Sequence, residues 1–195
     1  MNYLAHLYLA DGTPESLVGS LLGDFVRGDD YLRYSPAIQR AIMVHRKTDA
    51  FTDVHPIYIR SKRRLDPAFR HTKRILVDVF YDHFLAKNWH AYAAVPLEEF
   101  TREAYRALEL HEPDLPPRLR RMLPYMKADN WLLAYRELQG IGLTLEGLSR
   151  RMSRANLLAQ GLAALTDNYA ALESDFQAFF PQLQDYVAGL NKGYG

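Results

Sequence analysis

Residues 74–89, RILVDVFYDHFLAKNW, contain the pattern that decides the fold. Apolar side chains at Ile75, Val79, Phe80 and Phe84 recur at spacings of four and one, which places them on one face of an α-helix. A half-buried strand would instead alternate apolar and polar residues. The segment therefore predicts a helix whose apolar face is buried in a core.

The same periodicity extends outward along the chain. Leu17, Leu21 and Phe25 repeat every four residues, as do Ile38 and Ile42, and alternating strand patterns do not occur. We expect an all-α fold of roughly eight or nine helices, in one compact domain that spans residues 1–195. Glycine and proline predict breaks between the helices at residues 11–14, 28–30, 35–36, 55–56, 66–67, 95–96, 113–117, 140–142 and 181.

The composition narrows the possible functions. Cysteine is absent, which excludes disulfides, thiolate metal ligands and cysteine nucleophiles. The net charge of +1 produces no overall field that would attract nucleic acid, and the uncharged run that begins at Ala155 is too short to span a bilayer. The apolar opening MNYLAHLYLA has no basic leader, which argues against a secretory signal, so we expect a cytoplasmic protein. From the charge and hydropathy we expect neither nucleic-acid nor membrane partners.

Histidine and carboxylate side chains interrupt the apolar faces of several predicted helices. Residues four apart share a helix face, and this spacing relates Asn2 to His6, His45 to Asp49 and then Asp53, and Asp78 to Asp82, which His83 follows directly. Asp24 lies alone in the apolar segment LLGDFV. A buried carboxylate without a partner is costly, so each of these positions calls for an explanation.

Each residue alone has an ordinary structural role open to it. His6 could be a core histidine bonded to a carbonyl, Asp53 could cap the turn at 55–56, and Asp24 or Asp78 could pair with arginine. Together, the carboxylates would repel one another unless something positive lies between them. A mixed carboxylate and imidazole set suits a divalent cation, with a purely structural polar network as the alternative.

A basic segment lies between two of these helices. Residues 55–74 carry one acidic side chain, Asp66, and seven basic ones: Arg60, Lys62, Arg63, Arg64, Arg70, Lys73 and Arg74. The segment predicts either a solvated helix face or contact with a local anionic partner.

Four segments in order resemble the acyl carrier protein phosphodiesterase family. They are MNYLAHLYLA (1–10), GSLLGDFVRG (19–28), HRKTDAFTD (45–53) and VDVFYDHFLAKNW (77–89). A looser likeness continues through residues 127–136 and the C-terminal YAALESDFQAFFP. The four motifs together, in a chain of the family's length, make the resemblance specific.

The resemblance implies hydrolysis of the phosphodiester that joins 4′-phosphopantetheine to a serine of holo-acyl carrier protein. It also implies a divalent cation, Mn²⁺ before Mg²⁺ or others, and an all-helical fold related to the HD phosphohydrolases. No His-Asp dipeptide occurs here, and the one adjacent pair, Asp82-His83, is reversed. The ligand positions of HD enzymes therefore cannot be copied onto this chain.

The site residues expected from pattern and resemblance fall into two groups. Glycine-rich phosphate-binding loops and a G-x-S-x-G nucleophile turn are absent, which favours hydrolysis by water activated by a metal. Arg46 could neutralise a phosphoryl oxygen, and the proton donor could be His45, Lys47 or His83. The metal ligands are expected among Asp24, His45, Asp49, Asp78, Asp82, His83 and His6, and the catalytic residues among Asp24, His45, Arg46, Asp49 and His83.

The implied protein substrate also suits the basic segment. Holo-acyl carrier protein is acidic, so residues Arg60 to Arg74 would steer its encounter and orientation. Two other functions remain open: an HD-type metal phosphohydrolase that acts on nucleotides or small phosphodiesters, and a non-catalytic helical adaptor for an acidic protein. The oligomeric state is not determined by these patterns.

Overall fold

The computed structural model describes residues 1–193, and the regular structure within them is entirely helical, as predicted. Short 3₁₀ turns, η1 to η5, occupy Asp30–Arg33, Pro67–Thr72, Trp89–Ala91, Glu112–Asp114 and Leu158–Gln160. The α-helices are α1 (Tyr3–Tyr8), α2 (Pro14–Leu22), α3 (Pro36–Val54), α4 (Pro56–Arg64), α5 (Lys73–Lys87), α6 (Leu97–Leu110), α7 (Pro117–Ala128), α8 (Trp131–Ala134), α9 (Leu138–Arg151), α10 (Gly161–Asp167) and α11 (Tyr169–Lys192).

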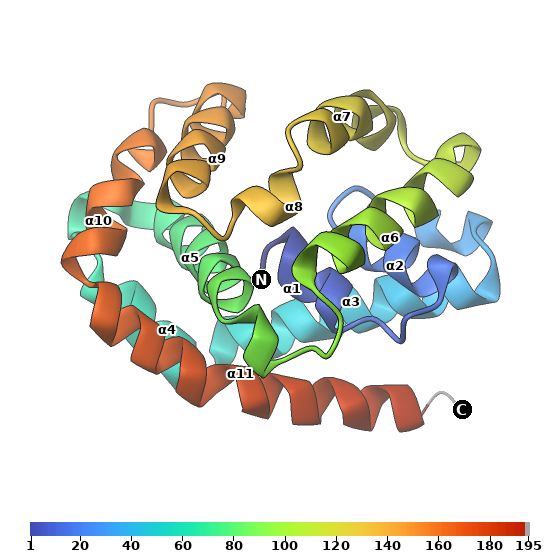
Figure 1. Ribbon diagram of the computed structural model, residues 1–195, viewed down its shortest axis with the longest axis horizontal. Helices are drawn as coiled ribbons and strands as arrows, with labels where there is room; N and C mark the ends of the chain where they lie inside the picture. The colour runs from blue at the N-terminus through green and yellow to red at the C-terminus, as the bar shows by residue number, and fades with distance from the viewer. Residues whose placement is uncertain (194–195) are drawn as a thin grey trace.

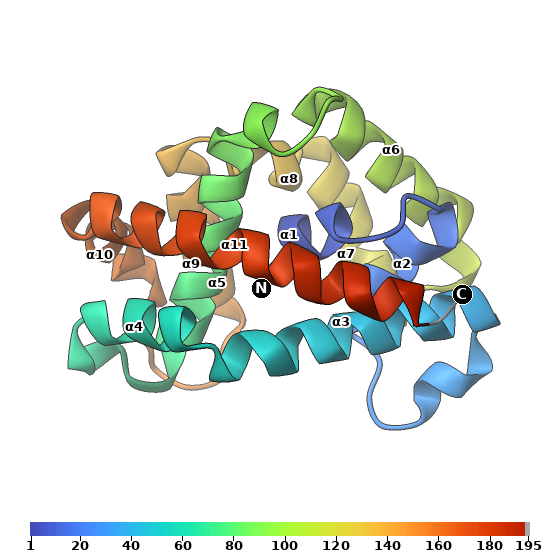
Figure 2. The ribbon, with the colours of Figure 1, turned by 90° about the horizontal axis from the view of Figure 1, so that it is seen from below.

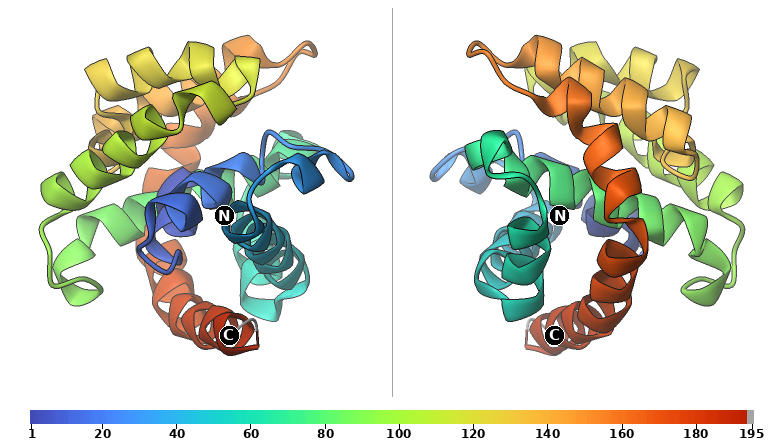
Figure 3. Two further views of the ribbon diagram at one scale, coloured as in Figure 1. Left: turned by 90° about the vertical axis from the view of Figure 1, so that its right-hand side faces the viewer. Right: turned by 90° about the vertical axis from the view of Figure 1, so that its left-hand side faces the viewer.

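The helices lie in tiers around α1 and α5. On one side, α11 runs alongside α3 and α4, which Figure 2 shows from below. On the other side, α6 to α9 form the upper part of the molecule (Figure 1), and the two side views separate this part from α11 (Figure 3). Helix α1 packs on α2 and α5, and α2 packs along α3. The N-terminal helix is therefore enclosed near the centre of the molecule.

Capping explains where the long N-terminal helices begin. Thr13 Oγ1 accepts a hydrogen bond from Ser16 N at 3.2 Å, and Ser35 Oγ accepts one from Ile38 N at 3.4 Å. A proline follows each cap in the first helical turn, where its missing N–H has no intrahelical partner to lose. These starts agree with the breaks predicted at residues 11–14 and 35–36.

Two predicted breaks are wrong because the residues lie inside helices. Pro181 lies within α11, whose neighbouring Phe176, Phe179 and Phe180 are fully buried and hold the helix against the core. Gly140 lies within α9, and a Cβ there would come within 2.0 Å of the Ala134 carbonyl oxygen. This glycine permits close approach of α8 and α9 rather than ending a helix.

Helix α5 positions α1 through a buried carboxylate. Asp82 accepts hydrogen bonds from Leu4 N at 2.8 Å and Ala5 N at 3.1 Å, which satisfies N–H groups at the start of α1. Burial raises the pKa of Asp82 to about 7. The result is a fixed position for His6, one residue further along α1.

No helix in residues 1–193 is both long and apolar enough to cross a bilayer.

Candidate metal centre

Four of the expected site residues meet where α1, the end of α2 and α3 come together. His6 lies on α1, Asp24 follows α2, and His45 and Asp49 are one turn apart on α3. The two histidines are buried, while the side chains of Asp49 and Asp24 are 21% and 40% exposed. One donor atom each from His6, His45 and Asp49 lies within 4.8 Å of the others. We call His6, Asp24, His45 and Asp49 the His/Asp cluster.

The two imidazole rings share the carboxylates. They stack with centroids 3.7 Å apart and planes inclined by 21°. His6 Nε2 lies 3.2 Å from Asp49 Oδ1, and His45 Nε2 lies 3.6 Å from Asp24 Oδ1 and 3.8 Å from Asp49 Oδ2. The ring nitrogens and carboxylate oxygens thus point toward a common region.

A backbone contact fixes the tautomer of His45. Its Nδ1 lies 2.7 Å from the carbonyl oxygen of Ser20, and because a carbonyl only accepts, Nδ1 carries the hydrogen. In the neutral ring, Nε2 then presents a lone pair to the carboxylates of Asp24 and Asp49, which also only accept. A proton or a cation is required to join these groups, and the donor set suits a divalent cation.

The electrostatics favour the protonation states that a cation requires. Burial is the largest of the effects that lower the pKa of His6 to about 4, so its ring is neutral at pH 7. Burial alone would raise the pKa of Asp49, but the Met1 ammonium group and His6 hold it well below its usual range. The Asp24 pKa is likewise lowered: burial alone would raise it, but the nearby His45 and His6 together outweigh burial. Neutral imidazole and ionised carboxylate are the metal-binding forms.

Gly23 permits the close approach of His45. A Cβ at this position would lie 2.2 Å from two carbon atoms of the His45 ring, closer than real side chains come. The glycine in the segment GSLLGDF therefore leaves room for the imidazole beside Asp24. Sequence reasoning did not assign it a role, although it directly precedes a predicted site residue.

Asp78 lies beside the cluster but has cations of the protein itself around it. The ammonium group of Met1 is 3.2 Å from both Asp49 Oδ1 and Asp78 Oδ1. Arg74 contacts Asp49 Oδ2 at 3.0 Å and Asp53 Oδ1 at 3.2 Å, and approaches Asp78 at 3.9 Å. Each oxygen of Asp49 therefore lies between a cation of the chain and a histidine: Oδ1 between the Met1 ammonium group and His6, and Oδ2 between Arg74 and His45.

The remaining candidate ligands and Arg46 lie in other surroundings. Both oxygens of Asp82 accept from the backbone of α1. His83 Nδ1 donates to the carbonyl oxygen of Tyr135, and its Nε2 accepts from the hydroxyl of Tyr169, each at 2.8 Å. Arg46 donates to two carbonyl oxygens of the loop at residues 26–28, at 3.0 Å each, and so holds the segment that follows Asp24.

The basic segment is divided among several contacts. Arg60 and Arg64 donate to Asp175, a buried residue of α11, at 2.9 and 2.7 Å. Lys73 donates to the carbonyl oxygen of Leu65 at 2.6 Å, and Arg74 belongs to the carboxylates described above. Lys62 Nζ lies 4.8 Å from the ring centroid of Tyr58, while Arg63 and Arg70 are exposed.

Two imidazoles and one carboxylate lie within 4.8 Å of one another, with a second carboxylate 3.6 Å from His45, and these are donors that a divalent cation in a metal-dependent hydrolase could use. The family model described as acyl carrier protein phosphodiesterase matches residues 1–183. This chain belongs to that family, as its motifs predicted, and the family is one of phosphodiester hydrolases. The HD-like relationship stays a prediction.

Curated relatives match over nearly the whole chain. An acyl carrier protein phosphodiesterase of Serratia proteamaculans (strain 568) is 39% identical over 184 residues, which is 94% of this chain and 95% of the relative. Proteins of the same name from Enterobacter sp. (strain 638) and Yersinia pestis are 38% and 36% identical, with the same coverage. No solved structure matches the chain significantly.

Proposed function

We propose that this chain, in the cytoplasm, hydrolyses the phosphodiester between 4′-phosphopantetheine and the serine of holo-acyl carrier protein. The products would be apo-acyl carrier protein and 4′-phosphopantetheine. Membership of the family and the names of the relatives support the substrate class. The observation that carries the chemistry is Nε2 of His45, which faces two carboxylates beside the neutral imidazole of His6.

The cation would be held by His6, His45 and Asp49, with Asp24 beside them. Two imidazoles among the donors favour Mn²⁺ over Mg²⁺, which takes oxygen ligands. When bound, such an ion polarises phosphoryl oxygens and lowers the pKa of water. The chain's own contribution is to hold the donors in place through Ser20, Asp82 and Gly23.

Asp24 is the group of the cluster best placed for proton transfer. Its side chain is 40% exposed, more than that of any other member, and its pKa is lowered, so it is ionised at neutral pH. An ionised carboxylate at the solvent side of the cluster can accept the proton of an attacking water. Arg46 fixes the loop that carries Asp24.

The acidic carrier protein would dock through the exposed part of the basic segment. Arg63 and Arg70 are the exposed members with no contact described above, whereas Arg60 and Arg64 already contact Asp175. Replacement of Arg63 by Glu should raise KM for holo-acyl carrier protein, with a weaker effect at high salt. An equal loss on a small phosphodiester would contradict a docking role.

Intact-mass spectrometry of holo-acyl carrier protein tests the reaction. We expect loss of the phosphopantetheine mass with Mn²⁺, no loss with EDTA, and no loss with His45→Ala. His90→Ala, which changes an exposed histidine outside the cluster, should behave as the wild type. Equal turnover with EDTA would reject the metal requirement. No turnover in any sample would reject the reaction, and a nucleotide panel would then test the other phosphohydrolase function.

A further inference from the structure

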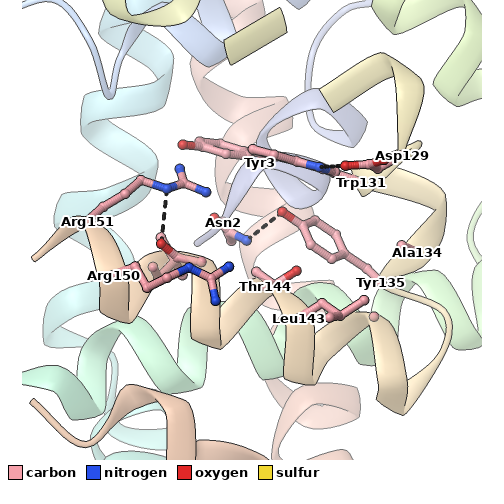
Figure 4. Close-up of a pocket in the computed structure, with 13 residues that line it drawn as sticks. Asn2, Tyr3, Asp129, Trp131, Ala134, Tyr135, Leu143, Thr144, Arg150 and Arg151 are labelled. Atoms are coloured by element: carbon pink, nitrogen blue, oxygen red, sulfur yellow. Dashed lines mark hydrogen bonds between the residues drawn. The ribbon is translucent and has the colours of Figure 1, made fainter. Parts of the chain in front are cut away.

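A cavity of about 460 Å³ lies between the start of α1 and helices α8 and α9 (Figure 4). This volume falls within the range of roughly 300–1,000 Å³ typical of small-molecule sites. The cavity is distinct from the His/Asp cluster, whose members do not line it. Its walls include Tyr3, Trp131, Tyr135, Leu143, Thr144 and Leu148.

The lining combines apolar walls with a few polar groups. Trp131, Leu143 and Leu148 provide apolar surface. Asn2 Nδ2 donates to the hydroxyl of Tyr135 at 3.1 Å, which holds the Asn2 carboxamide at the cavity (Figure 4). Thr144 adds a hydroxyl on the side of α9. Such a surface suits a ligand that is largely apolar and carries amide groups.

Helix α1 connects the cavity to the His/Asp cluster. Asn2 lines the cavity and His6 belongs to the cluster, and four residues of helix advance by about 6 Å. Tyr3 also spans the two, because it lines the cavity and stacks on Phe25, the neighbour of Asp24, with centroids 6.3 Å apart. A ligand in the cavity could therefore place one end beside the cluster.

Two arginines from the end of α9 give the cavity a positive edge. Arg151 lies over Trp131, with Cζ 5.2 Å from the ring centroid, and its Nε donates to the Gly147 carbonyl oxygen. Arg150 also lines the cavity and is 3.6 Å from Glu146. Positive charge at this edge favours a ligand with an anionic end.

We propose that this cavity holds the pantetheine arm of the substrate while the phosphodiester lies at the His/Asp cluster. The arm has the required chemistry: an apolar dimethyl group, two amides and a thiol, joined to an anionic phosphate. This inference rests on the proposed function, since that function supplies the arm. Besides Asn2 and Tyr3 of the first motif, it assigns substrate recognition to α8 and α9, which lie outside the four motifs of residues 1–89.

Filling the cavity from α9 provides the test. Gly147 lines it, and a Cβ there would meet only Arg151 Nη2, at 3.3 Å, the end of a flexible side chain. Gly147→Leu should therefore fold, and leucine favours a helix more than glycine does. Gly189→Leu is the matched control, because Gly189 lies in α11 with no atom within 4 Å of its added Cβ.

Two measurements decide the proposal. Calorimetric titration with pantetheine should show binding to the wild type and to Gly189→Leu, and at least about tenfold weaker binding to Gly147→Leu. KM for holo-acyl carrier protein should rise by a similar factor in Gly147→Leu and stay at the wild-type value in Gly189→Leu. Leu143→Trp at an exposed cavity position replaces Gly147→Leu if circular dichroism shows that the latter is unfolded.

The outcomes separate this inference from the proposed function. Equal pantetheine binding by both glycine variants, or no binding by the wild type, overturns the cavity assignment. If the wild type leaves holo-acyl carrier protein intact, the proposed function fails, and the pantetheine titration alone then decides what the cavity binds.

Discussion

His45 and His83 make the same kind of contact through Nδ1 but meet different partners at Nε2. Both are buried, and in both Nδ1 donates to a backbone carbonyl, that of Ser20 at 2.7 Å or Tyr135 at 2.8 Å. Nε2 of His83 accepts the hydroxyl of Tyr169 at 2.8 Å. Nε2 of His45 instead faces two carboxylates at 3.6 and 3.8 Å.

The difference lies in what the second nitrogen meets. A tyrosine hydroxyl can donate, so the surroundings of His83 are complete within the chain. Carboxylates only accept, so His45 needs a proton or a cation to complete the same arrangement. Burial and tautomer are therefore equal at the two histidines, and only the opposing partner distinguishes a structural environment from a candidate metal ligand.

The largest effect should follow from His45→Ala. Removal of this donor should lower the rate of phosphodiester hydrolysis by about 10²- to 10⁴-fold, the range for one group that acts directly in the reaction. Mn²⁺ affinity, measured by calorimetry, should fall with it. The thermal midpoint without metal should also fall, because the variant loses a buried ring and its hydrogen bond to the Ser20 carbonyl. Wild-type Mn²⁺ affinity in this variant would remove the distinction between the two histidines.

Gly23→Ala tests the position of the His45 ring without removing it. The added Cβ would lie 2.2 Å from the ring, so the imidazole must move away from Asp24. Displacement of a ligand by a supporting residue typically costs about 10- to 100-fold in metal affinity or activity. Gly189→Ala, at an open position in α11, is the control. Unchanged kcat and Mn²⁺ affinity would show that the ring position is not decisive.

The sequence predicted the helical fold and most helix boundaries, because the apolar spacing and the proline caps are local signals. It also brought His6, Asp24, His45 and Asp49 into one set of candidates. It could not separate them from Asp82 and His83, which show the same pattern on the same kind of helix. Their partners, the backbone of α1 and the hydroxyl of Tyr169, come from remote parts of the chain.

The partners of the basic segment could not be predicted from local sequence either. Its excess of arginine was visible, but Asp175, 111 residues beyond Arg64, was not paired with it by any local signal. The cavity at α8 and α9 also depends on contacts that no spacing rule reveals. Opposing partners are set by tertiary packing, so local sequence predicts which residues can act and not which do.

Asp175→Asn extends the comparison to a carboxylate whose partners are complete. Burial alone would raise the Asp175 pKa, but hydrogen bonds from Arg64, Arg60 and Ser61 lower it. We expect a loss of about 2 kcal/mol at pH 7, below the 3–5 kcal/mol of fully buried pairs because the arginines are partly exposed. Activity per folded molecule should be unchanged.

The pH dependence of this loss follows from the sign of the shift. Because the folded-state pKa is lower than the unfolded value of about 3.8, the ionised carboxylate stabilises the fold above that value and the contribution is lost as pH falls. Urea unfolding of wild type and Asp175→Asn should therefore differ at pH 7 and converge toward pH 3. A constant difference would mean that the arginine contacts do not stabilise the fold.

The smallest effect should follow from His83→Gln, and it tests the other half of the comparison. Glutamine can retain one of the two contacts to Tyr135 and Tyr169, so the free energy of unfolding should fall by about 1 kcal/mol, the net value of one hydrogen bond. Tyr169→Phe, which removes only the hydroxyl, should cost a similar amount. Mn²⁺ affinity should remain that of the wild type in both variants, because all of His83's partners lie within the chain. A loss of Mn²⁺ affinity in His83→Gln but not in Tyr169→Phe would place His83 among the metal ligands and show that a satisfied hydrogen-bond environment does not exclude that role.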